Sequence, residues 1–361
     1  MNCCKFCFKD SQISSIIKSY NNFGNCDICN KKEVEIVDID DASEIKNYIQ
    51  DFIDTYEYIG DKTDKRRGKI AKDLLSILVD DWNIFNLNKD QLKLLLFSFF
   101  PEWKSDGKLD TSKKYLIKDF FNITFKNENE IIKNSSWKDF VNEIKYENRF
   151  HSKQFNTEAF INILNSLSTN FNKGDFLFRG RVWEINKPFT IDEMGPPPTK
   201  YTKNGRVNSE GIQILYLGDS EKTVKYEIRS HLNDRITIGK FVSLKDLNII
   251  DLTKIGEISP FFTEDIQSFT KYLALNKLNL NDIEEHISKP HKRTDNNLDY
   301  LPTQYIADLI KSQSCFDGIK FKSTLFTNGF NIAVFNPSVF QCIAVSNIEI
   351  NSIEYNSTNI Y

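Results

Sequence analysis

The stretch Asn172-Lys-Gly-Asp-Phe-Leu-Phe-Arg-Gly-Arg-Val182 marks the point where the pattern of this 361-residue sequence changes. Before it, residues 157–169 place apolar side chains at helical spacing. The polar cluster at 172–175 is typical of a turn that ends a helix, and residues 176–182 have the composition of a strand. We therefore expect a domain boundary just before this stretch and a separate domain over residues 166–361.

Strand and helix signals follow one another through this C-terminal domain without a repeat. Strands are predicted at residues 214–217, 235–242, 317–323 and 331–336. Helices are predicted at residues 220–229, 266–275 and 303–312. The mixture predicts an α+β fold.

The N-terminal part of the sequence predicts a mostly α-helical domain over residues 35–165. Apolar residues recur there at helical spacing, without convincing strand alternation, in the segments 41–58, 70–78, 92–97 and 137–144. Residues 1–34 differ, because they are rich in cysteine and lack periodicity. We expect them to form a separate small cap.

Four cysteines of this cap form two pairs with metal-ligand spacing. Cys4 and Cys7 are followed by Cys26 and Cys29, which suits a tetrahedral zinc ion. Because all four ligands come from the protein, the expected zinc is structural. Cys3 is out of register and is not expected to be a ligand. The alternative is a set of buried cysteines without metal.

Composition limits the partners that the chain is expected to have. The sequence carries 47 basic and 50 acidic side chains, a net charge of −3 without a basic face, so nucleic acid is not an expected partner. The longest apolar run, Leu94–Phe100, is too short to span a bilayer, and the first residues do not resemble a signal peptide. We therefore expect a cytoplasmic protein without a membrane partner. The last two cysteines, Cys315 and Cys342, have apolar neighbours and are expected in the core.

Two groups of motifs follow one another in the C-terminal domain. The first group is Asp175-Phe-Leu-Phe-Arg-Gly-Arg181, Met194-Gly-Pro-Pro-Pro198, Gly205-Arg-Val-Asn-Ser-Glu-Gly-Ile-Gln-Ile-Leu-Tyr-Leu-Gly218 and Thr223-Val-Lys-Tyr-Glu-Ile-Arg229. The second group is Pro302-Thr-Gln-Tyr-Ile-Ala-Asp-Leu-Ile310, Phe316-Asp-Gly-Ile-Lys-Phe-Lys-Ser323 and Asn331-Ile-Ala-Val-Phe335. In content and order these motifs resemble the RES family. The resemblance implies a fold similar to that of ADP-ribosyltransferases and an enzyme that cleaves the nicotinamide–ribose bond of NAD.

The N-terminal region resembles the domain that precedes RES domains in the HEPN/RES-associated group. HEPN ribonucleases need an arginine and a histidine at a set spacing, and the histidines of this chain do not supply that pair: His151, His231, His286 and His291. The resemblance therefore does not extend to ribonuclease activity.

Matched residue by residue, the resemblance to the RES family assigns NAD binding and catalysis to Arg179, Arg206, Tyr216, Glu227 and Ser323. Guanidinium groups offer paired donors that suit a pyrophosphate. A carboxylate suits the oxocarbenium-like ribose that forms when nicotinamide leaves. The tyrosine suits stacking with its hydroxyl aimed at the site, and the serine suits ribose or carboxamide binding.

Plainer interpretations exist for each of these residues. Arg179 could be a surface arginine, Glu227 an ion-paired carboxylate on an exposed helix, and Ser323 a turn hydroxyl. Arg181 lies on the same strand face as Arg179 and could share its role. Tyr216 should face the opposite side of its strand from the leucines beside it.

The resulting hypothesis is a bacterial toxin or defence effector that depletes NAD by transferring its ADP-ribosyl group to phosphate or water. Zinc is then a structural cofactor, NAD the substrate and inorganic phosphate a candidate co-substrate. Two alternatives stay open, a protein ADP-ribosyltransferase and a non-catalytic nucleotide-sensing module. An antitoxin or other regulatory protein, and a second copy of the chain, are partners that the hypothesis allows.

Overall fold

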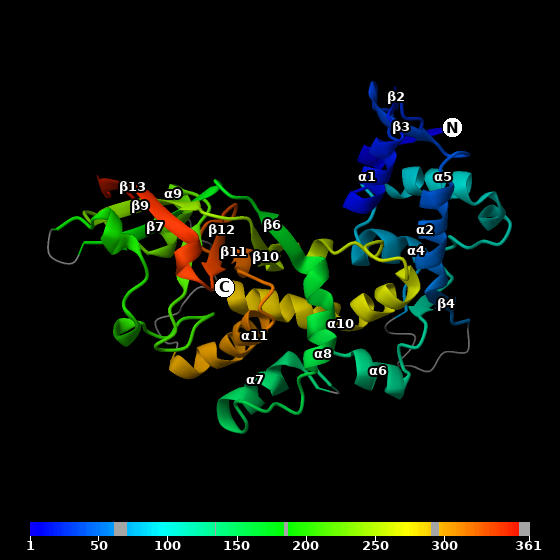
Figure 1. Cartoon of the computed structure of the whole chain (residues 1–361). Helices are drawn as coiled ribbons and strands as arrows, with labels where there is room; N and C mark the ends of the chain where they lie inside the picture. Colours follow the sequence, from blue (N-terminus) through cyan, green and yellow to red (C-terminus); the bar gives the residue numbers. More distant parts are fainter. Residues whose placement is uncertain (61–70, 134, 184–186, 290–295, 354–361) are drawn as a thin grey trace, which may run out of the picture. The chain divides into compact units, whose positions relative to one another are not determined.

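The computed structural model describes residues 1–60, 71–133, 135–183, 187–289 and 296–353 (Figure 1). The chain folds into two compact units, Met1–Glu130 with Glu257–Lys277 and Ile131–Gly256 with Leu278–Tyr361. Each unit is therefore assembled from two separate segments of the chain. The division into residues 1–34, 35–165 and 166–361 stays a prediction.

Helices and short strands make up the first unit. Its helices are α1 (Ser11–Ser19), α2 (Ser43–Asp54), α4 (Leu74–Ser76), α5 (Lys89–Phe99), α6 (Ile123–Asn129) and the first half of α10 (Ile266–Ser288). Its strands are β1 (Asn2–Cys4), β2 (Asn22–Gly24), β3 (Val34–Asp38), β4 (Tyr56–Tyr58) and β5 (Tyr115–Ile117). The strands pair antiparallel, in the orders β1-β3-β2 and β4-β5.

The helix predicted over residues 41–58 ends earlier than expected. Tyr56 begins β4 instead, because its backbone pairs with Ile117 of β5. Ile70, the first apolar position of the next predicted helix, lies outside the described residues.

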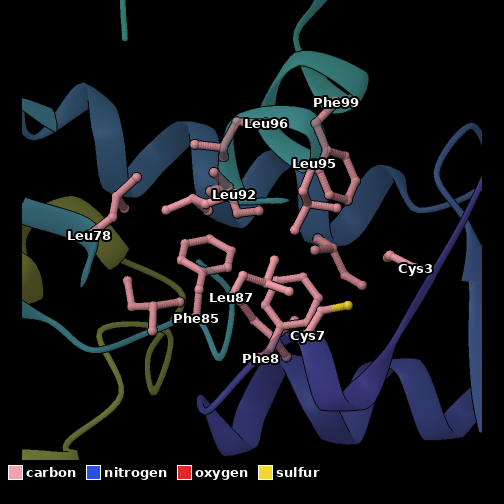
Figure 2. Close-up of a cluster of buried hydrophobic side chains, with 14 of the residues drawn as sticks. Cys3, Cys7, Phe8, Leu78, Phe85, Leu87, Leu92, Leu95, Leu96 and Phe99 are labelled. Carbon is pink, nitrogen blue, oxygen red and sulfur yellow. The ribbon is translucent and has the colours of Figure 1, made fainter. Parts of the chain in front are cut away.

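Helix α5 shows how the sequence builds the core of the first unit. Asn88 and Gln91 form a reciprocal capping box that starts the helix. The helix buries the apolar positions of one face: Leu92, Leu95, Leu96 and Phe99. Figure 2 shows these side chains near Phe8 and Phe85, whose ring centroids lie 5.3 Å apart. This face therefore holds the helix to the rest of the unit.

One eight-stranded sheet forms the centre of the second unit. Its strands are β6 (Ser168–Phe171), β7 (Phe176–Val182), β8 (Leu215–Gly218), β9 (Arg235–Ser243), β10 (Leu247–Asp251), β11 (Gly318–Lys322), β12 (Phe330–Val334) and β13 (Phe340–Glu349). The helices are α7 (Trp137–Tyr146), α8 (Thr157–Leu164), α9 (Glu221–Glu227), the second half of α10 and α11 (Leu301–Ser312). The α+β fold that the sequence predicts is confirmed.

The sheet is weakly joined between β7 and β8. The strand order is β13-β9-β7-β8-β12-β11-β10-β6, with only β10 and β11 parallel among these neighbours. β7 pairs with β9 along its whole length, whereas only Phe178 and Gly218 pair between β7 and β8. The two strands are therefore free to diverge away from this one pair.

Two glycines let helix α9 approach this junction closely. A Cβ atom on Gly180 of β7 would lie 2.6 Å from Cγ1 of Val224, and one on Gly218 of β8 would lie 2.9 Å from Cγ2 of the same residue. Only glycine fits at such distances. Val224 thus packs against both strands, and Glu227 follows it by about one helical turn.

Several features of the second unit differ from the prediction. Strands β6, β10 and β13 were not predicted, and α10 continues to Ser288 instead of ending near residue 275. Cys342 is buried as predicted, but Cys315 is exposed, because it lies in the turn after α11, next to Ser314 with a φ of 58°.

Within the described parts of the chain, no helix is both long and apolar enough to cross a bilayer.

Candidate functional site

A cavity of about 350 Å³ lies where β7 and β8 meet. Four of the predicted site residues line it: Arg179, Arg206, Tyr216 and Glu227. The fifth, Ser323, hydrogen-bonds to Glu227. The structure therefore brings all five predicted residues together.

Positive charge dominates the lining of this cavity. Arg179, Arg206, Arg229 and Lys289 contribute cations, and among the described lining residues Glu227 contributes the one carboxylate. A concave surface with this excess of positive charge favours an anionic ligand.

Arg179 is the cation that strand β7 contributes to the cavity. Its backbone pairs with Gly239 of β9, and its Nη1 atom is buried with no hydrogen-bond partner among the described residues. Burial lowers the pKa of Arg179 to about 10, and the nearby guanidinium of Arg181 adds to the effect. The side chain still carries its charge at neutral pH. A bound anion would supply the partner that this buried donor lacks.

Arg206 lies in a tight turn, Gly205–Asn208, in which Gly205 N–H donates to the carbonyl of Asn208 at 2.9 Å. Its Nη1 donates to the backbone carbonyls of His286 and Ile287 in the last turn of α10, at 3.4 and 3.3 Å. The last carbonyls of a helix lack partners within the helix and carry partial negative charge, so they attract a guanidinium. The end of α10 therefore orients Arg206 at the cavity wall.

Tyr216 connects this turn to the sheet. Leu215 and Leu217 are buried in the core, and Tyr216 between them lines the cavity, which Leu217 also contacts. Its hydroxyl donates to Asn208 Oδ1 at 2.8 Å and accepts from Val207 N–H at 3.4 Å. Burial raises the pKa of Tyr216, so the hydroxyl stays protonated at neutral pH. The hydroxyl thus holds the turn, where we had expected it to point at a ligand.

One carboxylate oxygen of Glu227, Oε1, accepts two hydrogen bonds. Its Oε1 accepts hydrogen bonds from Ser323 Oγ at 2.6 Å and from Asn331 Nδ2 at 2.9 Å, and both donors are buried. The surface ion pair of the plainer interpretation is not formed with Lys225, which pairs with Glu221 at 3.9 Å. No described residue hydrogen-bonds to Oε2. Two donors therefore fix the carboxylate and leave Oε2 for a ligand.

Two residues near the cavity have roles that the sequence did not indicate. Asn331 belongs to one of the motifs, but the sequence indicates no role for it, because its partner Glu227 lies 104 residues away in the chain. Arg181 does not line the cavity. Its Nη2 donates to the carbonyl of Gly195, and its guanidinium carbon lies 5.2 Å from the ring centroid of Phe189. Arg181 therefore supports the segment before the prolines.

The first unit contains a second candidate site, formed by Cys4, Cys7, Cys26 and Cys29. Their Sγ atoms all lie within 4.8 Å of one another. The separation is 3.8 Å for Cys4 and Cys7, and 3.5 Å both for Cys4 and Cys29 and for Cys7 and Cys26. Thiolates bound to one tetrahedral ion at about 2.3 Å lie roughly 3.8 Å apart. The four cysteines can therefore hold a metal ion.

The surroundings of the cysteines agree with this assignment. Cys29 N–H donates to Cys26 Sγ at 3.4 Å, and Asn30 then has a φ of 60°, so the chain turns tightly around the second pair. Cys3 is not part of the cluster. It is buried in the hydrophobic core, where Figure 2 shows it.

Comparison with known proteins defines the C-terminal region. This region is a mixed α+β domain with a cationic cavity. Its residues 179–354 match the family model of the RES domain. This region of the chain is therefore a RES domain, as its motifs indicated. No curated protein gives a significant match. Among solved structures, the crystal structure of the M. tuberculosis MbcT–MbcA toxin–antitoxin complex is similar at 12% identity and a TM-score of 0.29, over 52% of this chain and 91% of that chain.

Proposed function

We propose that the RES domain binds NAD in the cavity between β7 and β8 and cleaves the bond between nicotinamide and ribose. The activity known for RES domains suggests the reaction. The observation that carries the proposal is the convergence of two guanidinium groups, a tyrosine ring and a carboxylate from separate elements on one cavity.

Arg179 and Arg206 bind the pyrophosphate of NAD in this proposal. The unpartnered Nη1 of Arg179 gains an oxygen acceptor, and the phosphate charge offsets the cost of burying the cation. Arg206 reaches the same cavity from the end of α10. The ring of Tyr216 provides a surface on which the ribose or nicotinamide packs.

Glu227 stabilises the reacting ribose. When nicotinamide leaves with the bonding electron pair, C1′ of the ribose develops positive charge. The carboxylate lowers the energy of that charge through Oε2, while Ser323 and Asn331 hold Oε1 in place.

The acceptor in the proposed reaction is inorganic phosphate or water. Attack on C1′ gives ADP-ribose 1-phosphate in the first case and ADP-ribose in the second, with release of a proton. The cations Arg229 and Lys289 at the cavity favour phosphate, because they reduce its repulsion by the pyrophosphate.

We also propose that the metal held by the four cysteines is zinc and that its role is structural, because four protein thiolates fill a tetrahedral shell. In the cell, the proposed reaction would deplete NAD. This outcome suits a toxin or defence effector whose activity an antitoxin or regulatory protein holds in check.

Product analysis of labelled NAD, with and without phosphate, tests the proposal. Wild-type protein should release nicotinamide together with ADP-ribose 1-phosphate or ADP-ribose. Arg179→Ala and Glu227→Gln should each lower kcat/KM about a hundredfold or more, because each removes a charge that acts in the transition state. Label transferred to protein from a lysate would instead identify a protein ADP-ribosyltransferase. NAD that is bound but stays intact would identify a nucleotide-sensing module.

Matched variants control for the loss of charge alone. Arg235→Ala removes an exposed arginine from the neighbouring strand β9, and Glu221→Gln removes an exposed carboxylate from the same helix as Glu227. Both should keep wild-type activity. Equal losses in the controls and the site variants would argue against the assigned site.

A further inference from the structure

Gln304 is a buried amide in α11, within the motif Pro302-Thr-Gln-Tyr-Ile306, and only 4% of its surface is exposed. A polar side chain in such a place must find its hydrogen bonds inside the protein. Nε2 donates to the backbone carbonyls of Gly205 and Asn208, both at 2.8 Å. Oε1 accepts from Ser209 Oγ at 3.3 Å. Nε2 also lies 3.5 Å from Asn204 Oδ1. The hydrogen bonds of this side chain therefore go to the turn that carries Arg206 and to the residues on either side of it.

The two carbonyls lie at the two ends of the Gly205–Asn208 turn. Because Gly205 N–H also donates to the Asn208 carbonyl, Gln304 joins both ends of a closed turn to α11. A glutamine carries two hydrogens on Nε2, so both bonds form at once. Among side chains of this length, only glutamine offers two N–H donors without carrying a charge.

The turn is also held from within. Asn208 Nδ2 donates to the carbonyls of Lys203, Ser209 and Ile212 at 3.0 to 3.2 Å. A Cβ atom on Gly205 would lie 2.4 Å from Asn208 Oδ1, which shows how closely the turn is packed. The inside of the turn is therefore rigid. What remains to be fixed is the position of the whole turn, and the bonds from Gln304 fix it relative to α11.

We infer that Gln304 is a positioning residue for Arg206. It anchors the turn to α11, so that the arginine reaches both the end of α10 and the phosphates of the substrate. The inference rests on the proposed function for its effect on NAD, and it gives a role to a motif that the reaction itself does not use.

Gln304→Met and Gln304→Glu test the inference by kinetics in the full-length protein. Both keep the length of the side chain, but both lose the two donors, and glutamate also sets a carboxylate against two carbonyls. The KM for NAD should rise about tenfold or more, a cost of about 1.4 kcal/mol, because the turn that carries Arg206 loses both bonds to α11 and the Gly205 carbonyl loses its donor. The value of kcat should change less than KM. Asp308→Asn, one turn further along α11, is the matched control and should behave as the wild type.

A double-mutant cycle separates positioning from general destabilisation. If Gln304 acts through Arg206, Gln304→Met should add little to the loss already caused by Arg206→Ala. A purely structural role predicts that the two losses add in full, and that result would overturn the inference.

Trypsin gives a readout that does not depend on NAD. Loss of the anchor should free the turn, so cleavage after Arg206, identified by mass spectrometry, should be several-fold faster in both Gln304 variants than in wild type or Asp308→Asn. Unchanged cleavage together with an unchanged KM would refute the inference. If wild-type protein neither binds nor consumes NAD, the proposed function fails, and the cleavage rates alone still decide whether Gln304 holds the turn.

Discussion

At the scale of single residues, Arg179 combines a cost in stability with a proposed role in binding. Its buried guanidinium has no hydrogen-bond partner for Nη1 among the described residues, and burial lowers its pKa to about 10. For a base whose pKa falls on folding, the penalty is fully present below the folded pKa and is relieved as the pH rises through it. At neutral pH the free protein therefore carries the whole penalty.

Arg179→Met should accordingly stabilise the protein and abolish binding. Removing the unpaired cation should raise the Tm by about 2–4 °C for each kcal/mol gained, whereas the Tm increase that ADP-ribose gives to the wild type should disappear. Thermal unfolding with and without ADP-ribose at pH 7 measures both effects. A lower Tm in the variant, with ligand stabilisation retained, would show that the side chain has a partner and binds nothing in the cavity.

Asn331 should control the pH at which Glu227 works. Asn331→Asp replaces a donor 2.9 Å from Glu227 Oε1 by a second acid, and two carboxylates this close resist ionising together. The pKa of the pair then rises, so the acidic side of the pH–rate profile should move to higher pH by about one unit or more. Asn336→Asp makes the same charge change on an exposed residue after β12 and should leave the profile in place. Matching shifts in both variants would rule out a local effect on Glu227.

The sequence predicted the residues that we propose to bind NAD better than those that support them. Arg179, Arg206 and Glu227 could be named because family motifs carry them, and so could Tyr216. Gln304 and Asn331 escaped because their partners lie 99 and 104 residues away in the chain, and no local pattern reports such pairs. The hydrogen bond of the Tyr216 hydroxyl was missed for a different reason: its partner Asn208 is only 8 residues away, but the turn that brings the two together is not apparent in the sequence.

At the scale of elements, the distance between α9 and the sheet decides where Glu227 lies. Gly180→Ala should push α9 away, because the new Cβ would meet Cγ1 of Val224, a β-branched side chain with little freedom to move. We expect kcat for NAD cleavage to fall about tenfold or more, as Glu227 follows about one turn after Val224 on the helix. The double variant Gly180→Ala with Val224→Ala should recover much of this loss, because it restores the space.

Gly256→Ala is the matched control for this prediction. A Cβ atom there meets no other atom within 4 Å, so the substitution should leave kcat unchanged. Steady-state kinetics of the four proteins, with circular dichroism to verify folding, decides the matter. A double variant no more active than Gly180→Ala alone would contradict the steric explanation.

Elements with a strong local pattern were the ones that the sequence predicted well. Strand β7 was placed at Phe176–Val182, because turn residues precede an apolar segment. Strand β13 was missed, since as an edge strand it exposes many of its side chains and pairs only with β9. Helix α10 was predicted too short, because its later turns are rich in polar residues although Ile283 and Ile287 are fully buried there. These assignments depend on partners that a local pattern does not reveal.

At the scale of the whole molecule, the chain carries two kinds of site in two separately packed units. The four cysteines belong to the first unit and the cationic cavity to the second. The three β-strands next to the cysteines are short, with three, three and five residues. Such a small sheet is marginal by itself, so we expect the metal to provide much of the stability of this region.

Removal of the metal should therefore unfold the start of the first unit and spare the sheet of the second. Structural zinc sites contribute on the order of 10 kcal/mol, so treatment with a strong chelator or Cys29→Ser should abolish hydrogen-exchange protection in peptides covering residues 1–38. Peptides from β7 and β9 should keep theirs, because the eight-stranded sheet contains none of the four ligands. Elemental analysis should find one zinc ion for each wild-type chain and none in Cys29→Ser, while Cys315→Ser, which changes an exposed cysteine outside the cluster, should retain both metal and protection. Wild-type protein that contains no metal after purification without chelators, yet protects residues 1–38 as well as Cys315→Ser does, would show that the cysteines are held together by packing alone.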